Sequence, residues 1–247
     1  MSKTILTAIQ TQVSHRLAGL VIGCGALFGV SPAFAGAFTP PAGCTGWLTV
    51  QARACRVSNY YKCSQDAPGD QWRADFDQEG LFFASRIDAE AQWVESLEFN
   101  PSVRQTLDPG AEDPASFTEL LNGVDTFAFN LSRDDGGSSK VRGFDRLSGR
   151  TVQIDGVSLL ETSFEYTEID ASGTVTNRSH GNEYIHPEWR LFFAGPSQTD
   201  LGTGDLPIDG SPVEFIFPGE PGFFSTRPVF ECDAVLSSYS KGNSDGN

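Results

Sequence analysis

The sequence has few of the residues from which most enzyme sites are built. It contains three histidines and one methionine in 247 residues, and none of its serines lies in a G-x-S-x-G nucleophile elbow. It has no C-x-x-C pair of the kind that holds zinc, and no glycine-rich phosphate loop. These absences remove the usual motif-based assignments. The sequence therefore predicts no catalytic residue, no metal ligand and no cofactor.

Basic residues are also scarce. The chain has 17 Lys and Arg against 32 Asp and Glu, a net charge of −15. Such a negative potential disfavours binding to nucleic acid and to anionic membrane surfaces. Beyond the N-terminal region no stretch is long and apolar enough to cross a bilayer as a helix. We therefore expect no nucleic-acid partner and no transmembrane segment in the mature chain.

The N-terminal 35 residues have the pattern of a secretory signal. Lys3 and Arg16 supply positive charge, residues 17–30 form an apolar run, and Ala33-Phe34-Ala35 supplies the small residues before a cleavage site. A lipoprotein signal ending at Cys24 is the alternative, but the apolar run continues beyond that cysteine. We expect cleavage after Ala35 and a periplasmic or extracellular protein. Residues 36–236 would form a single β-rich domain, and residues 237–247 a disordered tail.

Four cysteines remain after such cleavage. An even number in an exported chain predicts two disulfides, for which three pairings are possible. We expect Cys55 to pair with Cys63 across a local hairpin, and Cys44 to pair with Cys232 so that the two ends of the domain are joined.

Alternating apolar and polar residues predict β-strands. In residues 160–167 the apolar side chains share one parity and two glutamates the other, and the turn Asp170–Gly173 leads to a second extended run that ends at Tyr184. Residues 72–87 give a second hairpin. Residues 91–99 fit a strand or a helix, and we favour a strand. Asp155-Gly156 indicates a two-residue turn.

Turn signals recur about every 8–15 residues, which favours an antiparallel meander over βαβ units. Asp113 and Pro114 predict the start of a short helix that ends near Gly123. Residues 145–149 are expected to turn, residues 195–212 to form a mobile loop, and residues 226–236 to form a strand. The predicted fold is mainly β, an antiparallel meander sheet or open barrel with one or two short helices and two disulfides.

Two sets of polar residues were candidates for chemistry. His180, Glu183 and His186 have regular spacing, but along a strand the two histidines lie roughly 20 Å apart and the glutamate faces the other side. With 32 acidic residues, pairs that resemble a glycosidase dyad arise by chance. The acidic pairs considered were Glu161 with Glu165, and Glu183 with Glu188.

Several short motifs lie along the chain: Gly46-Trp47, Cys55–Val57, Trp72–Gly80, Val141–Arg146, Gly181–Tyr184 and Phe215–Gly219. Together they resemble an uncharacterised family of bacterial exported β-rich proteins, and this resemblance conveys no activity. A weaker architectural likeness is to periplasmic lipoprotein carriers, in which a curved sheet cups a ligand against a helix. The chain differs from such carriers because it begins with cysteine-containing strands instead of an amphipathic helix.

These observations leave two functional hypotheses. The first is a non-catalytic envelope protein that binds a hydrophobic small molecule or an envelope protein on an aromatic-lined sheet; its 19 phenylalanines suit such a surface. The second is a carboxylate-dependent hydrolase that acts on an envelope polymer or lipid, with His186 as a further participant. A phenylalanine-lined cavity without perturbed carboxyls would favour binding, and His186 beside an acidic residue in a cleft would favour the enzyme.

Overall fold

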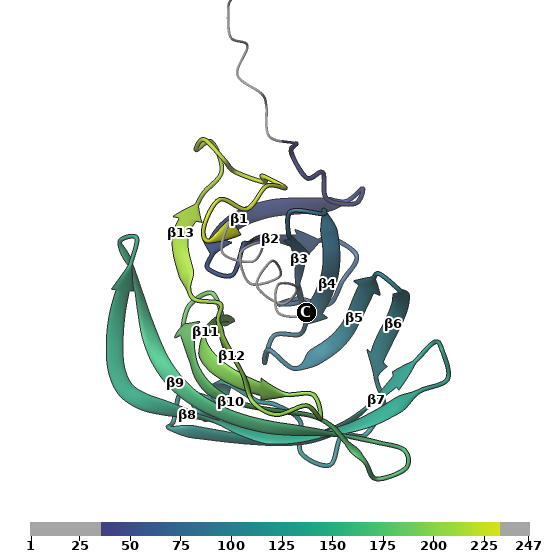
Figure 1. The fold of residues 1–247 in the computed structure, drawn as a ribbon. Helices are drawn as coiled ribbons and strands as arrows, with labels where there is room; N and C mark the ends of the chain where they lie inside the picture. The colour runs from purple at the N-terminus through teal and green to yellow at the C-terminus, as the bar shows by residue number, and fades with distance from the viewer. Residues whose placement is uncertain (1–35, 233–247) are drawn as a thin grey trace, which may run out of the picture. The chain divides into compact units, whose positions relative to one another are not determined.

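The computed structural model describes residues 36–232, which form one antiparallel sheet of 13 strands and a single short helix (Figure 1). Sheet order follows chain order from β1 to β12, and β13 pairs with β1 at the other edge. The predicted meander is therefore confirmed. The expected signal peptide and C-terminal tail lie outside the described residues.

The elements differ widely in length, and β7 to β11 are the longest. In chain order they are β1 (Cys44–Ala52), β2 (Arg56–Cys63), β3 (Gln71–Phe76), β4 (Leu81–Ile87), β5 (Trp93–Phe99), β6 (Ser102–Leu107), α1 (Phe117–Leu120), β7 (Val124–Arg133), β8 (Ser138–Ile154), β9 (Val157–Asp170), β10 (Val175–His186), β11 (Leu191–Asp200), β12 (Leu206–Asp209) and β13 (Pro212–Ile216).

The sheet curls so that its two edges approach each other. The long strands β8 to β10 lie across from β1 to β4 (Figure 1). The edge strands β12 and β13 are joined by only Gly210 and Ser211, and Arg53 N donates a hydrogen bond of 2.9 Å to Ser211 O. The edges do not pair with each other, so the sheet stays open along this line.

The hairpins predicted from alternation are present. β9 and β10 pair from Val175–Ile169 to Ile185–Leu160, and β3 pairs with β4. The tight turn at Asp155-Gly156 joins β8 to β9, and both residues have positive φ, 47° and 76°. Such values are those of the type I′ turn that matches strand twist. Residues 93–99 form β5, as favoured from the sequence.

The two faces of β1 to β4 are buried against different partners. One face contributes Leu48, Val50 and Tyr60 to an interior cluster. The other carries Tyr61 and packs against Phe224 from the segment that follows β13. A Cβ at Gly46 would lie within 2.4 Å of two atoms of the Phe224 ring. Gly46 is therefore required for the close approach of that ring to β1.

Helix α1 packs against β7 and β8. Its Phe117 and Leu120 side chains are buried among apolar residues of neighbouring strands and loops. Ser116, not the predicted Asp113, is the N-cap residue, since its hydroxyl accepts the Glu119 N–H. Glu90 in the β4–β5 loop accepts the Thr118 N–H at 2.8 Å. Among residues 36–232 no helix is both long and apolar enough to cross a membrane.

Three local predictions were wrong. The turn expected at residues 145–149 is a bulge within β8, where the register with β9 shifts between Leu147 and Thr151. Most of the loop expected at residues 195–212 is strand, because β11 runs to Asp200 and β12 pairs with it. Residues 226–232 form no strand. The side chain of buried Gln51 instead bonds their backbone, at Arg227 O and Val229 N.

The four cysteines within residues 36–232 all form disulfides, but the predicted pairing was wrong. Cys44 pairs with Cys63 and Cys55 pairs with Cys232. Cys44 lies directly opposite Cys63 on neighbouring strands, because residues 56–63 form β2 instead of a loop. Cys55 ends up beside Cys232 because the segment after β13 folds back, and its Phe230 O accepts the Cys55 N–H at 3.1 Å.

The two bridges are expected to contribute unequally to stability. The Cys55–Cys232 bridge spans 177 residues and the Cys44–Cys63 bridge 19. Loop-closure entropy assigns about 5 kcal/mol to the longer loop and about 3 kcal/mol to the shorter. We expect Cys55→Ser/Cys232→Ser to lower the free energy of unfolding more than Cys44→Ser/Cys63→Ser in urea denaturation. An equal or reversed order would show that the long-range bridge does not restrain the unfolded chain.

Candidate functional site

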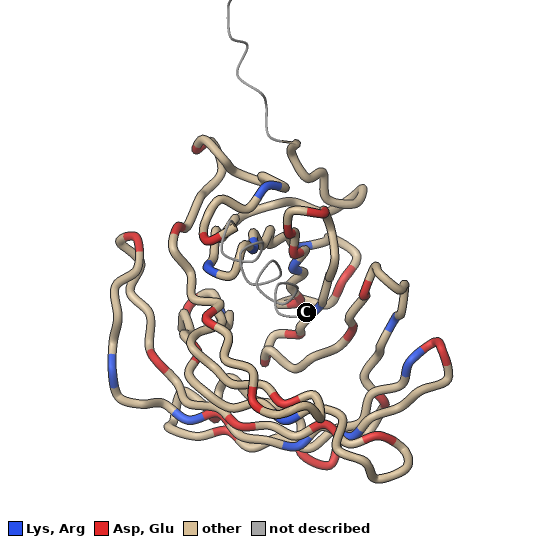
Figure 2. The backbone as a smooth tube through the Cα atoms, in the orientation of Figure 1, with Lys and Arg blue, Asp and Glu red and all other residues tan. Residues whose placement is uncertain are grey.

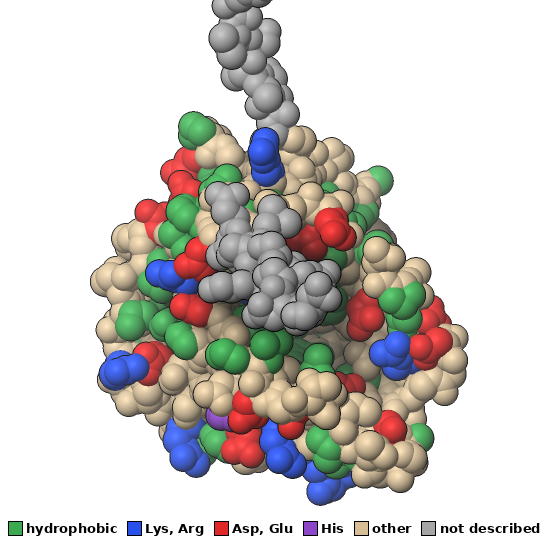
Figure 3. Space-filling view, in the orientation of Figure 1, with side chains coloured by type: hydrophobic (Ala, Val, Ile, Leu, Met, Phe, Trp, Pro, Cys, Tyr) green, Lys and Arg blue, Asp and Glu red, His purple; other side chains and the backbone are tan. Residues whose placement is uncertain are grey.

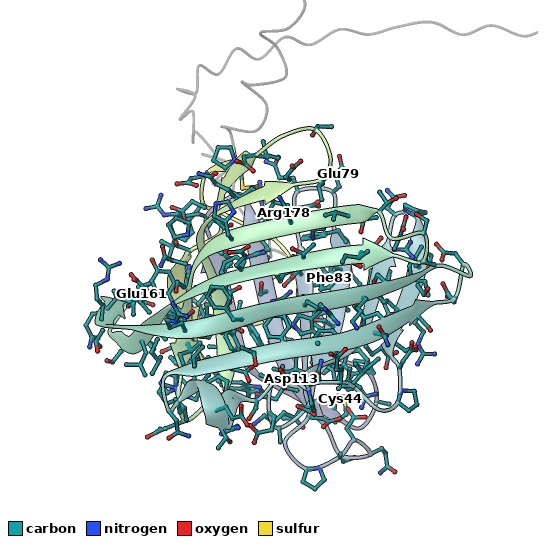
Figure 4. All side chains as sticks on the ribbon, turned by 90° about the horizontal axis from the view of Figure 1, so that it is seen from below. Cys44, Glu79, Phe83, Asp113, Glu161 and Arg178 are labelled. Carbon is teal, nitrogen blue, oxygen red and sulfur yellow. A yellow bond between two sulfur atoms is a disulfide. The ribbon has the colours of Figure 1, made fainter. Side chains whose placement is uncertain are left out.

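The curled sheet encloses a cavity of about 500 Å³. Residues on every strand from β2 to β12 line it, together with Phe117 of α1. Figure 4 views the molecule through the long strands, with Phe83 of β4 lying behind them; Phe83 is one of the lining residues. A cavity of this size falls within the range of small-molecule sites, about 300–1,000 Å³.

Aromatic rings form much of the cavity wall. The Trp93 ring meets the rings of Phe129 and Tyr166 edge-on, at centroid distances of 5.6 and 5.7 Å. Phe164 stacks on Tyr166 at 6.2 Å, and Phe127 packs against Phe129. These residues come from β5, β7 and β9, so the wall is assembled across the sheet.

Three carboxyl groups interrupt this wall. Asp125 on β7 lies directly opposite Asp145 on β8, and Asp145 lies opposite Phe164 on β9. On the next strand Gly181 is opposite Phe164, and Glu183, two residues further on, is opposite Thr162. All three acidic residues line the cavity. Like charges at opposed positions of neighbouring strands destabilise a sheet, so this arrangement is not explained by sheet formation.

The two aspartates are buried with unused acceptor capacity. Asp125 is 3% exposed; its Oδ2 accepts the Ser116 N–H at 3.0 Å, whereas its Oδ1 has no hydrogen-bond partner in the described part of the chain. Asp145 is 9% exposed. Within residues 36–232 neither Asp145 nor Glu183 forms an ion pair.

Burial shifts the acid–base properties of all three groups. Desolvation, followed by the charge of Asp125, raises the pKa of Asp145 to about 7. Desolvation and the nearby Asp145 raise the pKa of Glu183 to about 8, against the opposing effect of Arg73 and Arg56. Desolvation also raises the pKa of Asp125 to about 6, although its bond from Ser116 acts in the other direction. At neutral pH Glu183 and, in part, Asp145 therefore hold protons that exposed carboxyls would lose.

Two arginines approach this part of the cavity, but both have other partners. Arg73 Nε lies 3.0 Å from Asp75 Oδ2, and its guanidinium carbon lies 5.6 Å from the Phe83 ring centroid. Arg56 Nη2 donates to Gly210 O at 3.3 Å. Neither forms an ion pair with Asp125, Asp145 or Glu183 in the described part of the chain. The carboxyl groups are therefore only partly compensated.

The residues considered from sequence do not converge. The His186 ring stacks on Trp189 at 3.7 Å, and its Nδ1 accepts the Trp189 N–H at 3.2 Å. His180 borders a separate shallow depression beside β12. In residues 36–232 no group of three or more His, Cys, Asp or Glu side chains is arranged to hold a metal ion.

The predicted acidic pairs are also separated. Glu161 is bound to Arg150 and Glu165 is exposed. Glu188 is exposed too, whereas Glu183 lines the cavity.

Sequence reasoning missed Asp125 and Asp145. A signal was available, because Asp125 shares parity with Phe127, Phe129 and Leu131, the buried face of β7. A carboxylate on an apolar face is an exception that needs an explanation. Asp145 was assigned to a turn, which hid its position on the inner face of β8.

The outer surface carries charge without a comparable cluster. Figure 2 shows acidic positions scattered along the backbone. On the face shown in Figure 3, basic side chains gather along the edge formed by the long strands. Some of these side chains form exposed ion pairs, such as Lys140 with Glu112 at 2.8 Å. Exposed ion pairs contribute little to the free energy of unfolding.

No family model, no curated protein and no solved structure matches this chain. The cavity and its side chains are therefore the features of this protein that bear on its function.

The raised pKa of Glu183 predicts an unusual pH dependence of stability. A carboxyl whose pKa is higher folded than unfolded stabilises the fold below its unfolded pKa, about 4.5, and this contribution is lost as pH rises through about 8. We expect the free energy of unfolding to fall between pH 5 and pH 8.5. Glu183→Gln should raise it at pH 8.5 by about 1–3 kcal/mol, since one pKa unit corresponds to about 1.4 kcal/mol.

Urea denaturation across this pH range would measure the effect. Glu165→Gln is the matched control, because Glu165 lies on the exposed face of β9 and should leave the pH profile unchanged. A wild-type profile that rises towards pH 8.5, or an identical profile for Glu183→Gln, would contradict the raised pKa.

Proposed function

We propose that this protein is a binding module that holds a small, largely apolar molecule inside its curled sheet. The observation that supports this proposal is the cavity of about 500 Å³, whose aromatic walls come from β2 to β5 and, across the interior, from β7 and β9. Ligand sites combine apolar walls with a few polar groups that fix orientation. Asp125, Asp145 and Glu183 supply such groups here. The cavity therefore has the composition of a ligand site rather than of a filled protein core.

An inward-facing site favours a small molecule over a protein partner. The aromatic wall residues Phe127 and Phe129 are buried, 8% and 2% exposed, so a folded protein has no access to them. The large exposed apolar side chains are spread over several elements, whereas interaction surfaces are contiguous patches. Of the two partners considered from sequence, a small molecule fits the described structure better.

The two disulfides are consistent with an exported protein, because such bonds persist in oxidising compartments. The proposed location is the periplasm or the extracellular space. In that setting the module would sequester or carry its ligand outside the cytoplasm, and the disulfides would hold the curled sheet together.

Binding of a neutral apolar probe tests the proposal. N-phenyl-1-naphthylamine fluoresces more strongly in an apolar site, and we expect saturable enhancement with the wild-type protein. Ser85→Trp should weaken the affinity by about tenfold or more, since Ser85 lines the cavity and an indole there would occupy the ligand volume. Fluorescence titration measures the affinity.

Phe82→Trp is the matched control for this variant. It introduces the same side chain on the same strand, at a position that is 37% exposed, and should keep wild-type affinity. Circular dichroism would establish that both variants are folded. Absence of saturable binding to the wild type, or equal affinity of Ser85→Trp and wild type, would contradict an interior binding site.

A second candidate function is a hydrolase that uses the cavity carboxyls. The specific observation in its favour is that the pKa values of Asp145 and Glu183 lie near neutrality, about 7 and about 8, where a carboxyl can act as general acid or base. His186 has no part in this version, because its ring stacks on Trp189 outside the cavity lining.

Turnover of chromogenic substrates tests the hydrolase. With 4-nitrophenyl butyrate and 4-nitrophenyl glycosides, an enzyme of this type should lose about 100-fold or more of its rate in Asp145→Asn, which is the usual range for general acid–base groups. Glu165→Gln should retain the wild-type rate. Failure of the wild type to release 4-nitrophenol, or full activity in Asp145→Asn, would contradict the mechanism.

A further inference from the structure

No ion pair in the described part of the chain explains the burial of the three cavity carboxyls. Asp125 and Asp145 face each other across β7 and β8, and both are more than nine-tenths buried. Asp125 Oδ1 has no hydrogen-bond partner among the described residues, and Asp125 is one of the residues that line the cavity. A buried carboxylate is costly unless it is paired or protonated. Within residues 36–232 the protein supplies no ion-pair partner to any of the three groups.

The charges that face these groups come from several elements. Besides desolvation, the negative charges of Glu119, Asp113 and Glu90 near α1 raise the pKa of Asp125. Besides desolvation, the charge of Asp145 raises the pKa of Glu183, whereas the charges of Arg73 and Arg56 lower it. Arg73 is paired with Asp75, and Arg56 donates to the neutral Gly210 O and keeps its charge. Within the described residues one unpaired arginine therefore faces three acidic groups, and their ionised forms leave an excess of negative charge around Asp145.

Aromatic rings stand beside the same groups. Phe164 lies opposite Asp145 on the neighbouring strand, and Tyr166 is close enough for Glu183 to influence its hydroxyl. Phe127 follows Asp125 on the same inner face of β7. Rings and carboxylates together form the surroundings in which quaternary ammonium groups are bound.

We propose, on the basis of the binding function above, that the ligand is an organic cation, an amine or quaternary ammonium with an apolar or aromatic body. Its positive nitrogen lies among Asp125, Asp145 and Glu183, and its body packs against Phe127, Phe129 and Phe164. When the cation enters, a proton held by the carboxyl groups is released to solvent. Binding is therefore stronger at high pH than at low pH.

An isosteric pair of probes isolates the role of charge. Phenyltrimethylammonium and tert-butylbenzene have nearly the same shape, but only the first carries a positive charge. We expect the wild type at pH 8.5 to bind phenyltrimethylammonium about tenfold or more tightly than tert-butylbenzene, as measured by ligand-observed NMR titration. The affinity for the cation should fall at pH 5.5, and the affinity for tert-butylbenzene should not.

Variants assign the effect to the carboxyl groups. Glu183→Gln and Asp145→Asn should each weaken cation binding at pH 8.5 by about tenfold and leave tert-butylbenzene binding unchanged. Glu165→Gln and Asp205→Asn, at exposed positions, are the matched controls and should behave as wild type. Two separate variants are used so that a folding defect in one leaves the other informative.

The outcomes separate this inference from the proposed function. Equal affinity for both probes, or cation binding that is unaffected in Glu183→Gln and Asp145→Asn, would overturn the cation assignment. If N-phenyl-1-naphthylamine binds in the same experiments, the interior binding site itself still stands. If none of the three probes binds, both the cation assignment and the proposed function are wrong.

Discussion

A single β-sheet has to bury one of its two faces. Here the sheet curls, so that side chains on its inner face pack against one another across the interior. Sheets usually bury a face against a second layer. In the described residues β1 to β4 have such a cover, where Phe224 packs against Gly46 and Tyr61. Along β7 to β10 the inner residues face across the interior instead. Side chains that meet across a curved wall leave volume that a flat, two-layer core would fill, and this volume is the cavity.

The ends and edges of the sheet show how the curl is held. Helix α1 packs against β7 and β8. It is fixed by Glu90 from the β4–β5 loop, which in turn pairs with Arg190 at 2.8 Å. The edge strands β12 and β13 are kept close by a two-residue link. The Cys55–Cys232 bridge attaches the C-terminal segment to the start of β2. Open edges invite pairing with other chains, and tethers of this kind restrain such exposure.

Burial of like charges inside this wall sets the chemistry of the site. Asp125 and Asp145 occupy opposed positions on neighbouring strands, so neither can move away from the other without breaking the pairing of β7 and β8. Removal from water and mutual repulsion both favour the protonated form. The raised pKa values of these residues and of Glu183 are consequences of one arrangement, and they connect stability, proton binding and ligand charge. Both candidate functions, ligand binding and hydrolysis, use these carboxyl groups. They differ in whether a molecule that enters the cavity is only held there or is also chemically changed.

The sequence by itself determined the strands, many of the turns and the number of disulfides, because these depend on alternation with period two, on residues such as Gly156 that tolerate positive φ, and on cysteine count. It did not determine which cysteines pair or which acids converge. Asp125 and Glu183 are 58 positions apart in the chain and lie near Asp145 only because three hairpins place β7 to β10 in register. Local pattern records which face a residue occupies. Only the curl and register of the whole sheet decide what stands opposite it.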